Sequence, residues 1–208
     1  MGFVEIDPAS ELEGRRGYFV LTSLVVPRPI AWISTISPEG RRNLAPHSYF
    51  NVMSARPMIL HFTSTGVKDT LTNVRNTGEF VVNIVDVDVV RKMNVTAADF
   101  PPGEDEFDWA GLTAAPSTVV KPPRVEEAKA AFECRLRDVV SMGEGNMAFG
   151  EVVRIHIDEA ILSDGRIDVR KLNPVGRLGG SGYVEVAKGL FELKRPRYDD
   201  LKGSGPQP

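Results

Sequence analysis

The hydrophobic and polar positions of this chain change period several times, and their pattern predicts mostly strands. Two apolar, β-branched and aromatic runs near the N-terminus predict strands at Tyr18–Val26 and Pro29–Ser37. The stretch Ser37–Gly40 has proline and glycine in the places that a type I turn favours, so we expect the chain to return through Arg41–Ala45 as a hairpin. A further alternating run predicts a strand at Met58–Ser64.

The hydrophobic period lengthens to that of a helix in two places. A leucine and a valine three apart, an acid at the start and a glycine just past the end predict a helix at Asp69–Asn76. The segment Asp86–Phe100 spaces its apolar residues in the same way and predicts a second helix. Between the two helices, the continuous apolar run Glu79–Val85 predicts a buried strand.

The second half of the chain returns to strands after an interruption. Prolines and acids crowd Pro101–Pro123, which predicts an irregular excursion over the surface. The segments Ala130–Gly143 and Met147–Leu162 then predict two strands joined by a glycine-rich hairpin turn. Many strands with two short helices predict a mainly β protein, a closed antiparallel barrel rather than alternating βαβ units.

Length and composition agree with one ordinary globular domain. The chain has 208 residues, 42% of them hydrophobic and 25% charged, and we expect one domain over residues 1–208 with a core at about 18–196. The polar tail at about 199–208 is expected to be disordered. A net charge of -3 and the lack of a basic, aromatic stripe argue against a nucleic-acid partner.

The sequence also indicates a location in the cell. No signal peptide precedes the first elements, and no apolar run approaches the ~20 residues that a membrane-spanning helix needs. We therefore expect a cytoplasmic protein with no membrane partner. The single cysteine, Cys134, rules out an intramolecular disulfide and is expected to be a buried, unreactive thiol.

Several well-known catalytic motifs are missing. No glycine-rich fingerprint follows a strand as in dinucleotide-binding domains, and no phosphate-binding loop, zinc-protease helix or nucleophile elbow is present. The three histidines and one cysteine lack the spacing of a metal site, so no metal is expected.

What remains is a set of small polar and aromatic residues at consecutive strand ends. Ser34 and Thr35 end one strand, and Asn43–Phe50 supplies backbone amides, a serine and two aromatic rings. A third group leads into the predicted helix at Asp69: Ser64, Thr65, Gly66, Lys68 and Thr70. Free N–H groups at a helix start, together with a lysine, favour an anion. A mononucleotide with a flat heterocycle would use all three groups.

Four sequence blocks carry a resemblance to a known family. They are RPIAW at Arg28–Trp32, NLAPHSYF at Asn43–Phe50, KDT at Lys68–Thr70 followed by Asn73, and GRLGG at Gly176–Gly180. In this order they resemble the flavin reductase-like family of FMN-binding split β-barrels, in its flavoredoxin branch. The resemblance covers roughly residues 18–196 and implies a six-stranded Greek-key split barrel with a few short helices. It also implies a homodimer with FMN at or near the subunit interface, and apolar surface beside Pro101–Pro123 is expected to contribute.

The resemblance implies roles for particular residues. The phosphate of FMN would lie near Ser64, Lys68 and Thr70, with Ser34 or Thr35 close by. The isoalloxazine edge would meet backbone around Asn43, Ala45, Pro46 and Ser48, and Arg177 would help to complete the site, from either subunit. His47 is a candidate for a catalytic role, although the flavin itself carries the redox chemistry. Taken alone, Lys68 also fits a solvated surface lysine, and Asp69 fits an ordinary helix-start acid.

The resemblance further implies an NAD(P)H-dependent flavin reductase. Hydride would pass from the nicotinamide to flavin N5, and free flavin or a redox partner would accept the electrons. Two other readings stay open: a non-catalytic FMN carrier or electron-transfer flavoprotein, and a small barrel that binds another ligand, such as an oligonucleotide.

Overall fold

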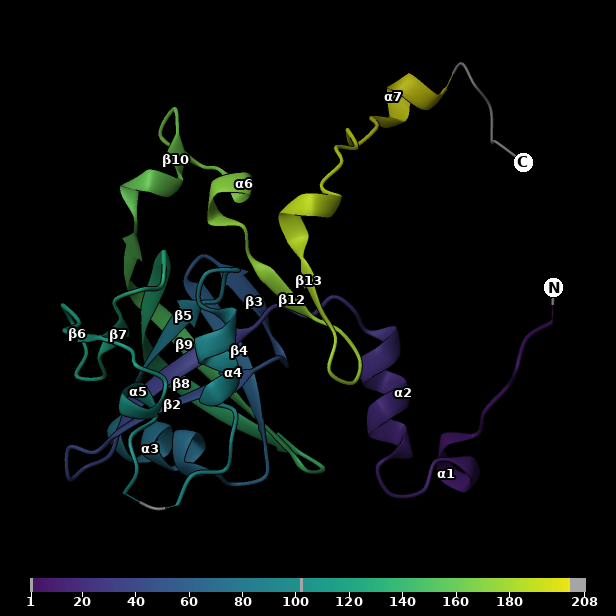
Figure 1. Cartoon of the computed structure of the whole chain (residues 1–208). Coiled ribbons are helices and arrows are strands. Elements are labelled where there is room, and N and C mark those ends of the chain that lie inside the picture. The colour runs from purple at the N-terminus through teal and green to yellow at the C-terminus, as the bar shows by residue number, and fades with distance from the viewer. Residues whose placement is uncertain (1, 102, 203–208) are drawn as a thin grey trace.

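The computed structural model of the chain describes residues 2–101 and 103–202, and its centre is one large antiparallel sheet (Figure 1). Seven strands pair in the order β2-β1-β5-β8-β9-β4-β3. In chain order they are β1 Ala31–Ile36, β2 Arg42–His47, β3 Phe50–Ala55, β4 Met58–Thr65, β5 Glu79–Ile84, β8 Ala130–Met142 and β9 Gly145–Ile157.

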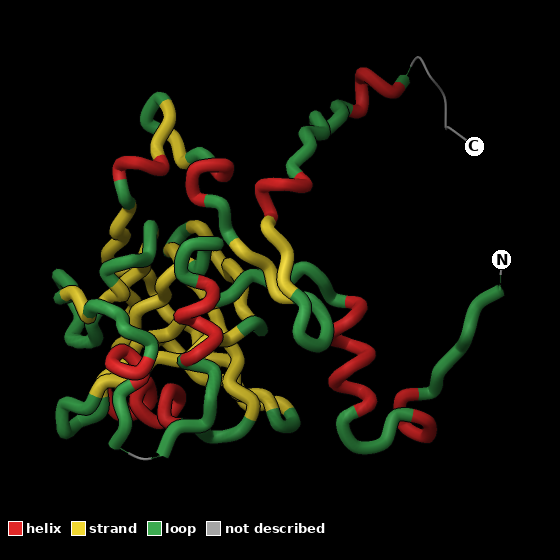
Figure 2. Tube along the Cα trace, viewed as in Figure 1, coloured by secondary structure: helices red, strands yellow, loops and turns green. Residues whose placement is uncertain are grey.

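The connection between β2 and β3 shows that this sheet curls on itself. These strands stand at opposite ends of the pairing order, yet only Ser48 and Tyr49 join them. The Thr63 N–H on β4 donates to the Tyr49 carbonyl at 2.8 Å, which fastens this crossover to the sheet. The strands therefore wrap round a common interior, with the helices outside (Figure 2).

Strand β1 is buried on both faces, which explains its nearly continuous apolar sequence. Ala31 and Ile33 point into the barrel, where they join Phe62 and Phe80 in one core cluster. The Trp32 side chain lies on the opposite face, in a second cluster with residues of the helices that cover the barrel. The strand is thus held between two cores.

Seven helices and three small two-stranded sheets complete the described part of the chain. The helices are α1 Pro8–Glu11, α2 Arg16–Leu24, α3 Asp69–Thr77, α4 Val90–Val95, α5 Glu106–Trp109, α6 Val169–Leu172 and α7 Tyr198–Leu201. The strand pairs are β6 Ala114–Ala115 with β7 Arg124–Val125, β10 Leu162–Ser163 with β11 Arg166–Ile167, and β12 Val175–Arg177 with β13 Tyr183–Glu185. Two 3₁₀ turns lie at Glu159–Ile161 and Val186–Gly189. Among the described residues, no helix is long and apolar enough to cross a membrane.

Most of the sequence-based elements are confirmed. The Ser37–Gly40 turn joins β1 to β2, and its Gly40 N–H donates to the Ser37 carbonyl at 2.9 Å. Helix α3 ends at Gly78, which adopts φ 71°, a left-handed conformation that glycine accepts without steric cost. A mainly β protein with a few short helices is what the structure shows, but its main sheet has seven strands. The six-stranded Greek-key arrangement stays a prediction.

The predicted strand at Tyr18–Val26 is wrong, because this segment forms helix α2. Its apolar run is short, and a run of that length does not distinguish a strand from a helix by periodicity. The helix stops just before Pro27, where proline cannot continue it. Only Thr22 of this helix is buried within the chain, so its apolar side chains remain on the surface.

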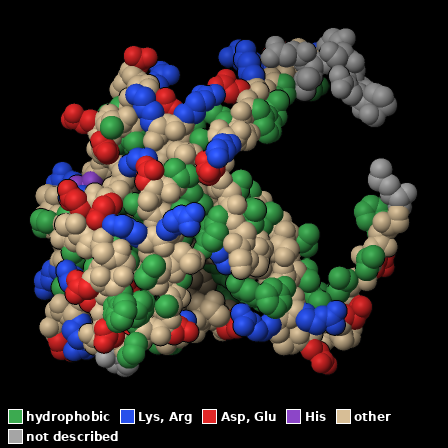
Figure 3. All heavy atoms as spheres, in the orientation of Figure 1, with side chains coloured by type: hydrophobic (Ala, Val, Ile, Leu, Met, Phe, Trp, Pro, Cys, Tyr) green, Lys and Arg blue, Asp and Glu red, His purple; other side chains and the backbone are tan. Residues whose placement is uncertain are grey.

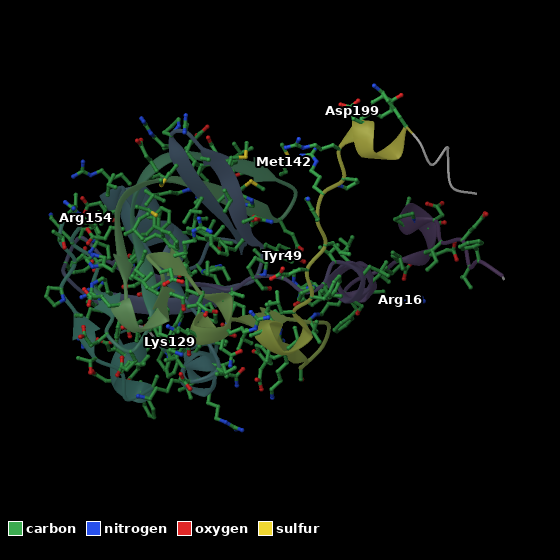
Figure 4. The ribbon with its side chains drawn as sticks, turned by 90° about the horizontal axis from the view of Figure 1, so that it is seen from above. Arg16, Tyr49, Lys129, Met142, Arg154 and Asp199 are labelled. Atoms are coloured by element: carbon green, nitrogen blue, oxygen red, sulfur yellow. The ribbon has the colours of Figure 1, made fainter. Side chains whose placement is uncertain are left out.

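Both ends of the chain run out from the barrel on the same side (Figures 1 and 4). The N-terminal arm carries α1 and α2, and the C-terminal arm follows β13 and carries α7. Hydrophobic side chains gather over α2 beside the open space between the arms (Figure 3). The tail predicted to be disordered begins inside α7, and its residues 203–208 lie outside the described residues.

Candidate functional site

An open cavity of about 540 Å³ lies where β2, β4 and α3 meet. Its volume is in the range of pockets that hold small molecules and cofactors, roughly 300–1,000 Å³. Nine of the twelve predicted cofactor-binding residues line it: Asn43, Ala45, Pro46, His47, Ser48, Ser64, Thr65, Lys68 and Thr70. The hairpin return and the turn into α3 are therefore brought together as the sequence predicts.

Ser34 and Thr35 do not reach this cavity, since both are fully buried on β1. The Thr35 hydroxyl accepts hydrogen bonds from the side-chain amides of Asn43 at 3.2 Å and Asn73 at 3.0 Å. Asn43 also donates to the Thr70 hydroxyl at 3.0 Å. These buried bonds tie β1, β2 and α3 together behind the cavity wall and fix its shape.

Arg177 lies at a different cavity of about 730 Å³, between α4 and the β12–β13 pair. Its guanidinium carbon stands 4.5 Å from the centre of the Tyr183 ring, and its Nη2 donates to the Gly180 carbonyl at 2.5 Å. Within one chain, Arg177 therefore does not join the other predicted site residues.

The GRLGG block packs against the RPIAW block and the helix before it. A methyl group on Gly179 would come within 2.6 Å of the Ser23 hydroxyl, and one on Gly176 within 2.8 Å of the Pro27 Cβ. The backbones of Arg28 and Arg177 exchange two hydrogen bonds of 2.9 and 2.8 Å. These glycines thus allow the loop after β12 to lie directly on α2 and the segment that follows it.

One end of the cavity is the start of α3. Lys68 is the N-cap residue, and no side chain among the described residues caps the first turn. The first intrahelical bond is donated by the Thr72 N–H to the Lys68 carbonyl at 3.0 Å, which leaves earlier N–H groups free for a ligand. The Lys68 ammonium group lies 3.2 Å from the Asp99 carboxylate, and both side chains are exposed. This end is suited to an anion that competes with Asp99 for the lysine.

His47 supplies an unpaired polar atom in the wall of the cavity. Its Nε2 is buried without a hydrogen-bond partner in the described structure. Burial lowers the pKa of His47 to about 4, while a bond to the Thr63 backbone opposes this shift and the Lys68 charge adds to it. The imidazole is therefore neutral at pH 7 and suited to pair with a ligand rather than to carry a charge.

The backbone of β2 offers fewer free donors to a ligand than the sequence predicts. The Leu44 N–H faces away from β1 and donates to the Glu106 carboxylate at 3.1 Å. Because N–H groups along a strand alternate in direction, those of Asn43 and Ala45 face β1. Pro46 has no N–H, and Ser48 lies beyond the β1–β2 register. Of the predicted segment Asn43–Ser48, the Ser48 N–H therefore remains as a donor outside the β1–β2 pairing.

Two parts of the cavity wall were not predicted. One is Tyr18 of α2, which lines the cavity together with Tyr49. Figure 4 shows Tyr49 on the side of the barrel nearest α2. The other is the segment after α4 with the start of α5, which contributes Thr96, Ala97, Ala98, Asp99, Phe100 and Glu106. Burial raises the pKa of Glu106, its own N–H and the Leu44 N–H lower it, and the Asp105 and Asp69 charges raise it again.

The cavity therefore combines features that fit a flavin mononucleotide. Helix N–H groups and Lys68 stand at one end, and Tyr18, Tyr49 and Phe100 supply aromatic surface. The unpaired Nε2 of His47 is an orphaned acceptor or donor that a heterocycle would satisfy. The residues present thus fit the group that the sequence resemblance implies.

Comparisons with known proteins point the same way. A family model described as a flavin reductase like domain matches residues 23–171. The structure is similar to nitrilotriacetate monooxygenase component B from Bacillus cereus, with 36% identity, a TM-score of 0.88, and coverage of 93% of this chain and 100% of that one.

Two further solved structures are similar. The 2-nitrobenzoate 2-nitroreductase NbaA of Pseudomonas fluorescens shares 32% identity at a TM-score of 0.87, over 94% of this chain and 98% of that one. Flavoredoxin of Desulfovibrio vulgaris shares the fold at a TM-score of 0.75 with 24% identity, over 82% and 91% of the two chains. The predicted resemblance is confirmed: the chain belongs to the flavin reductase-like family.

Proposed function

We propose that this protein binds FMN in the cavity between β2 and α3 and acts as an NAD(P)H-dependent flavin reductase in the cytoplasm. The observation that carries the proposal is the pairing of an uncapped helix start beside Lys68 with the unpaired Nε2 of His47 in one cavity. A phosphate and a heterocycle joined by a flexible chain would satisfy both ends. Free flavin or a protein partner would then accept the electrons.

Each part of the cavity has a distinct task in this proposal. The α3 N–H groups, Ser64, Thr65 and Lys68 would hold the phosphate, and Thr70 supports them from behind through Asn43. His47 and Ser48 would meet the edge of the ring, and the tyrosines would exclude water. A bound flavin accepts a hydride from a nicotinamide, so the side chains need only bind and orient it.

The test is the absorbance spectrum of the purified protein with FMN, followed anaerobically after NADH or NADPH is added. We expect uptake of FMN near one per chain and bleaching of its visible band by a nicotinamide. Uptake without bleaching would leave a carrier or electron-transfer protein, and no uptake would leave a barrel for another ligand. Because NbaA is named a nitroreductase, 2-nitrobenzoate is a useful second electron acceptor in the same assay.

Lys68→Ala is expected to weaken FMN binding about tenfold or more while leaving riboflavin binding nearly unchanged. A charge-assisted contact contributes about 1.5–3 kcal/mol, and only FMN has the phosphate that makes it. The matched control is Asp99→Asn, which removes the carboxylate 3.2 Å from Lys68 and should tighten FMN. Titration of both flavins against the three proteins checks this. Equal losses for FMN and riboflavin in Lys68→Ala would place the phosphate elsewhere.

We also propose that the protein is a homodimer, formed through α2 and the terminal arms. Their exposed apolar side chains include Phe3, Val4, Phe19, Leu21, Leu24, Phe191 and Leu193. Over α2, hydrophobic side chains gather on one surface (Figure 3), as is typical of a contact site. We propose that these segments, rather than the surface beside Pro101–Pro123, form the interface, which would lie next to the cavity because Tyr18 of α2 lines it.

Sedimentation is expected to give about twice the 22.8 kDa mass of one chain. Changing Leu21 and Leu24 together to Asp should yield a monomer, whereas Ile167→Asp, at another exposed apolar position on β11, should leave the mass unchanged. A parent protein that sediments as a monomer, or a double variant that stays dimeric, would contradict this interface.

A further inference from the structure

Arg28 is a buried cation without an acidic partner. Its side chain and backbone together are only 6% exposed, and no Asp or Glu of the described chain lies within ion-pair distance of it. The other buried charged side chains have close partners: Asp86 lies 3.3 Å from the Lys129 ammonium group, and Glu133 accepts hydrogen bonds from three backbone N–H groups and lies 2.6 Å from the His156 ring. A buried charge without a counter-ion is costly, so its retention calls for a reason.

The guanidinium of Arg28 connects three segments. Its Nη1 donates to the carbonyls of Thr22 at 2.6 Å and Val25 at 2.8 Å, at the end of α2. Its Nη2 donates to the Leu178 carbonyl at 3.1 Å, in the loop after β12. These carbonyls accept three of the five N–H donors of Arg28 and leave its charge without a counter-ion.

The fourth contact of Arg28 reaches the wall of the cavity. Its Nε lies 3.4 Å from the hydroxyl of Ser48, in the crossover between β2 and β3. The Arg28 guanidinium is thus separated from the cavity by one side chain, that of Ser48. The Arg28 charge also acts on the neighbouring Tyr49. Burial and Tyr18 raise the pKa of Tyr49, and Arg28 opposes this rise.

The charged residues that line the cavity are mostly acidic, so the position of the Arg28 charge matters for a negatively charged ligand. Asp69, Asp99 and Glu106 line it, and the one lysine among the lining residues, Lys68, stands with Asp99 at the phosphate end. At the Ser48 end, Arg28 is a buried cation, whereas Arg15, whose guanidinium carbon lies 5.7 Å from the centre of the Tyr18 ring, is exposed to solvent. A ligand that gains negative charge there would be stabilised by Arg28 through a desolvated, low-dielectric path.

We propose that Arg28 is a positioning residue of the flavin site: it fixes Ser48 against α2 and the loop after β12, and its uncompensated charge favours the reduced, anionic state of the bound flavin. This inference rests on the proposed function. It assigns to the RPIAW block a second task, the tuning of the cofactor, besides its place in the fold.

The experiment compares Arg28→Met and Arg28→Gln, which remove the charge, with Arg28→Lys, which keeps it. For each protein loaded with FMN, the reduction potential is measured against a reference dye and the melting temperature is recorded. In the neutral variants, reduced flavin should lose at least about tenfold more affinity than oxidised flavin, which corresponds to a potential lower by about 30 mV. Arg28→Lys should melt at a lower temperature than the parent, because lysine cannot make the forked contacts, yet keep its potential.

A purely structural residue would change the melting temperature of all three variants and the potential of none, and that result overturns the proposal. If neither neutral variant folds, Arg28 is a folding residue and the proposal is equally overturned. A parent protein that takes up no FMN is a separate outcome, because it removes the proposed function itself. A lowered potential in Arg28→Gln with a normal potential in Arg28→Lys supports the assignment.

Discussion

Replacing Glu133 with glutamine is expected to lower the free energy of unfolding by about 3 kcal/mol, because it breaks a buried, fully bonded carboxylate. The Glu133 side chain on β8 is 0% exposed. It accepts hydrogen bonds from the N–H groups of Thr118, Val119 and Val120 at 2.7, 2.6 and 3.0 Å, and its Oε1 lies 2.6 Å from His156 Nε2. Glutamine keeps one acceptor oxygen and turns an amide group toward backbone donors.

Urea unfolding of Glu133→Gln and of the parent measures this loss. Glu126→Gln is the matched control, since its carboxylate is 58% exposed and 3.7 Å from the Arg124 guanidinium. An exposed pair of this kind contributes about 0–1 kcal/mol. If Glu133→Gln unfolds at the urea concentration of the control, the bonds to the segment at Thr118 do not hold the excursion onto the sheet.

The same group predicts a dependence of stability on pH. Burial alone would raise the pKa of Glu133, but the Thr118 N–H, the His156 ring and the N–H groups of Val119 and Val120 lower it to about 2, from an ordinary value of 4.5. Protonation therefore favours the unfolded chain: the contribution is complete above pH 4.5 and is lost as the pH falls toward 2. Over this interval the stabilities of the parent and of Glu133→Gln should converge.

The elements that the sequence predicts correctly are those whose signals are local. A few adjacent residues predict the turn at Ser37–Gly40 and the end of α3 at its glycine, because the backbone conformation at each place favours particular residue types. Helix α2 has no such advantage. Its apolar residues pack against neither core of the chain. Their spacing is therefore not set by the burial of one helix face, and it does not show the helical period.

The candidate site follows the same rule. The nine predicted residues that line the cavity belong to two continuous segments, the β2 return and the turn into α3, which neighbouring strands bring together. Glu106 and Tyr18 belong to elements that are distant from β2 in the sequence, and no local pattern indicates that they lie near β2. The order of the four sequence blocks also does not indicate how far Arg177 lies from the other predicted site residues. In the folded chain it lies at another cavity.

A large effect on flavin binding is also expected from substitution of Ser48. Ser48 lies between His47 and Tyr49 in the crossover that closes the barrel, and all three line the cavity. Its side chain is small, and its hydroxyl contacts only Arg28 among the hydrogen bonds of the described chain. Because Ser48 lines the cavity, a bulky side chain here is expected to occupy part of the space where the ring is proposed to bind.

Ser48→Trp is therefore expected to weaken FMN binding by at least about a hundredfold, or ~2.8 kcal/mol, while the protein still folds. Ser48→Ala should cost only about 0.5–1.5 kcal/mol of flavin binding, since the loss is one hydroxyl. Asn51→Trp is the control for size, because Asn51 is exposed on β3 and does not line the cavity. Flavin titration and thermal melting of the three variants decide the matter. A Ser48→Trp protein that melts with the parent and binds FMN as tightly would move the flavin out of this cavity, because no ring can share that space with an indole.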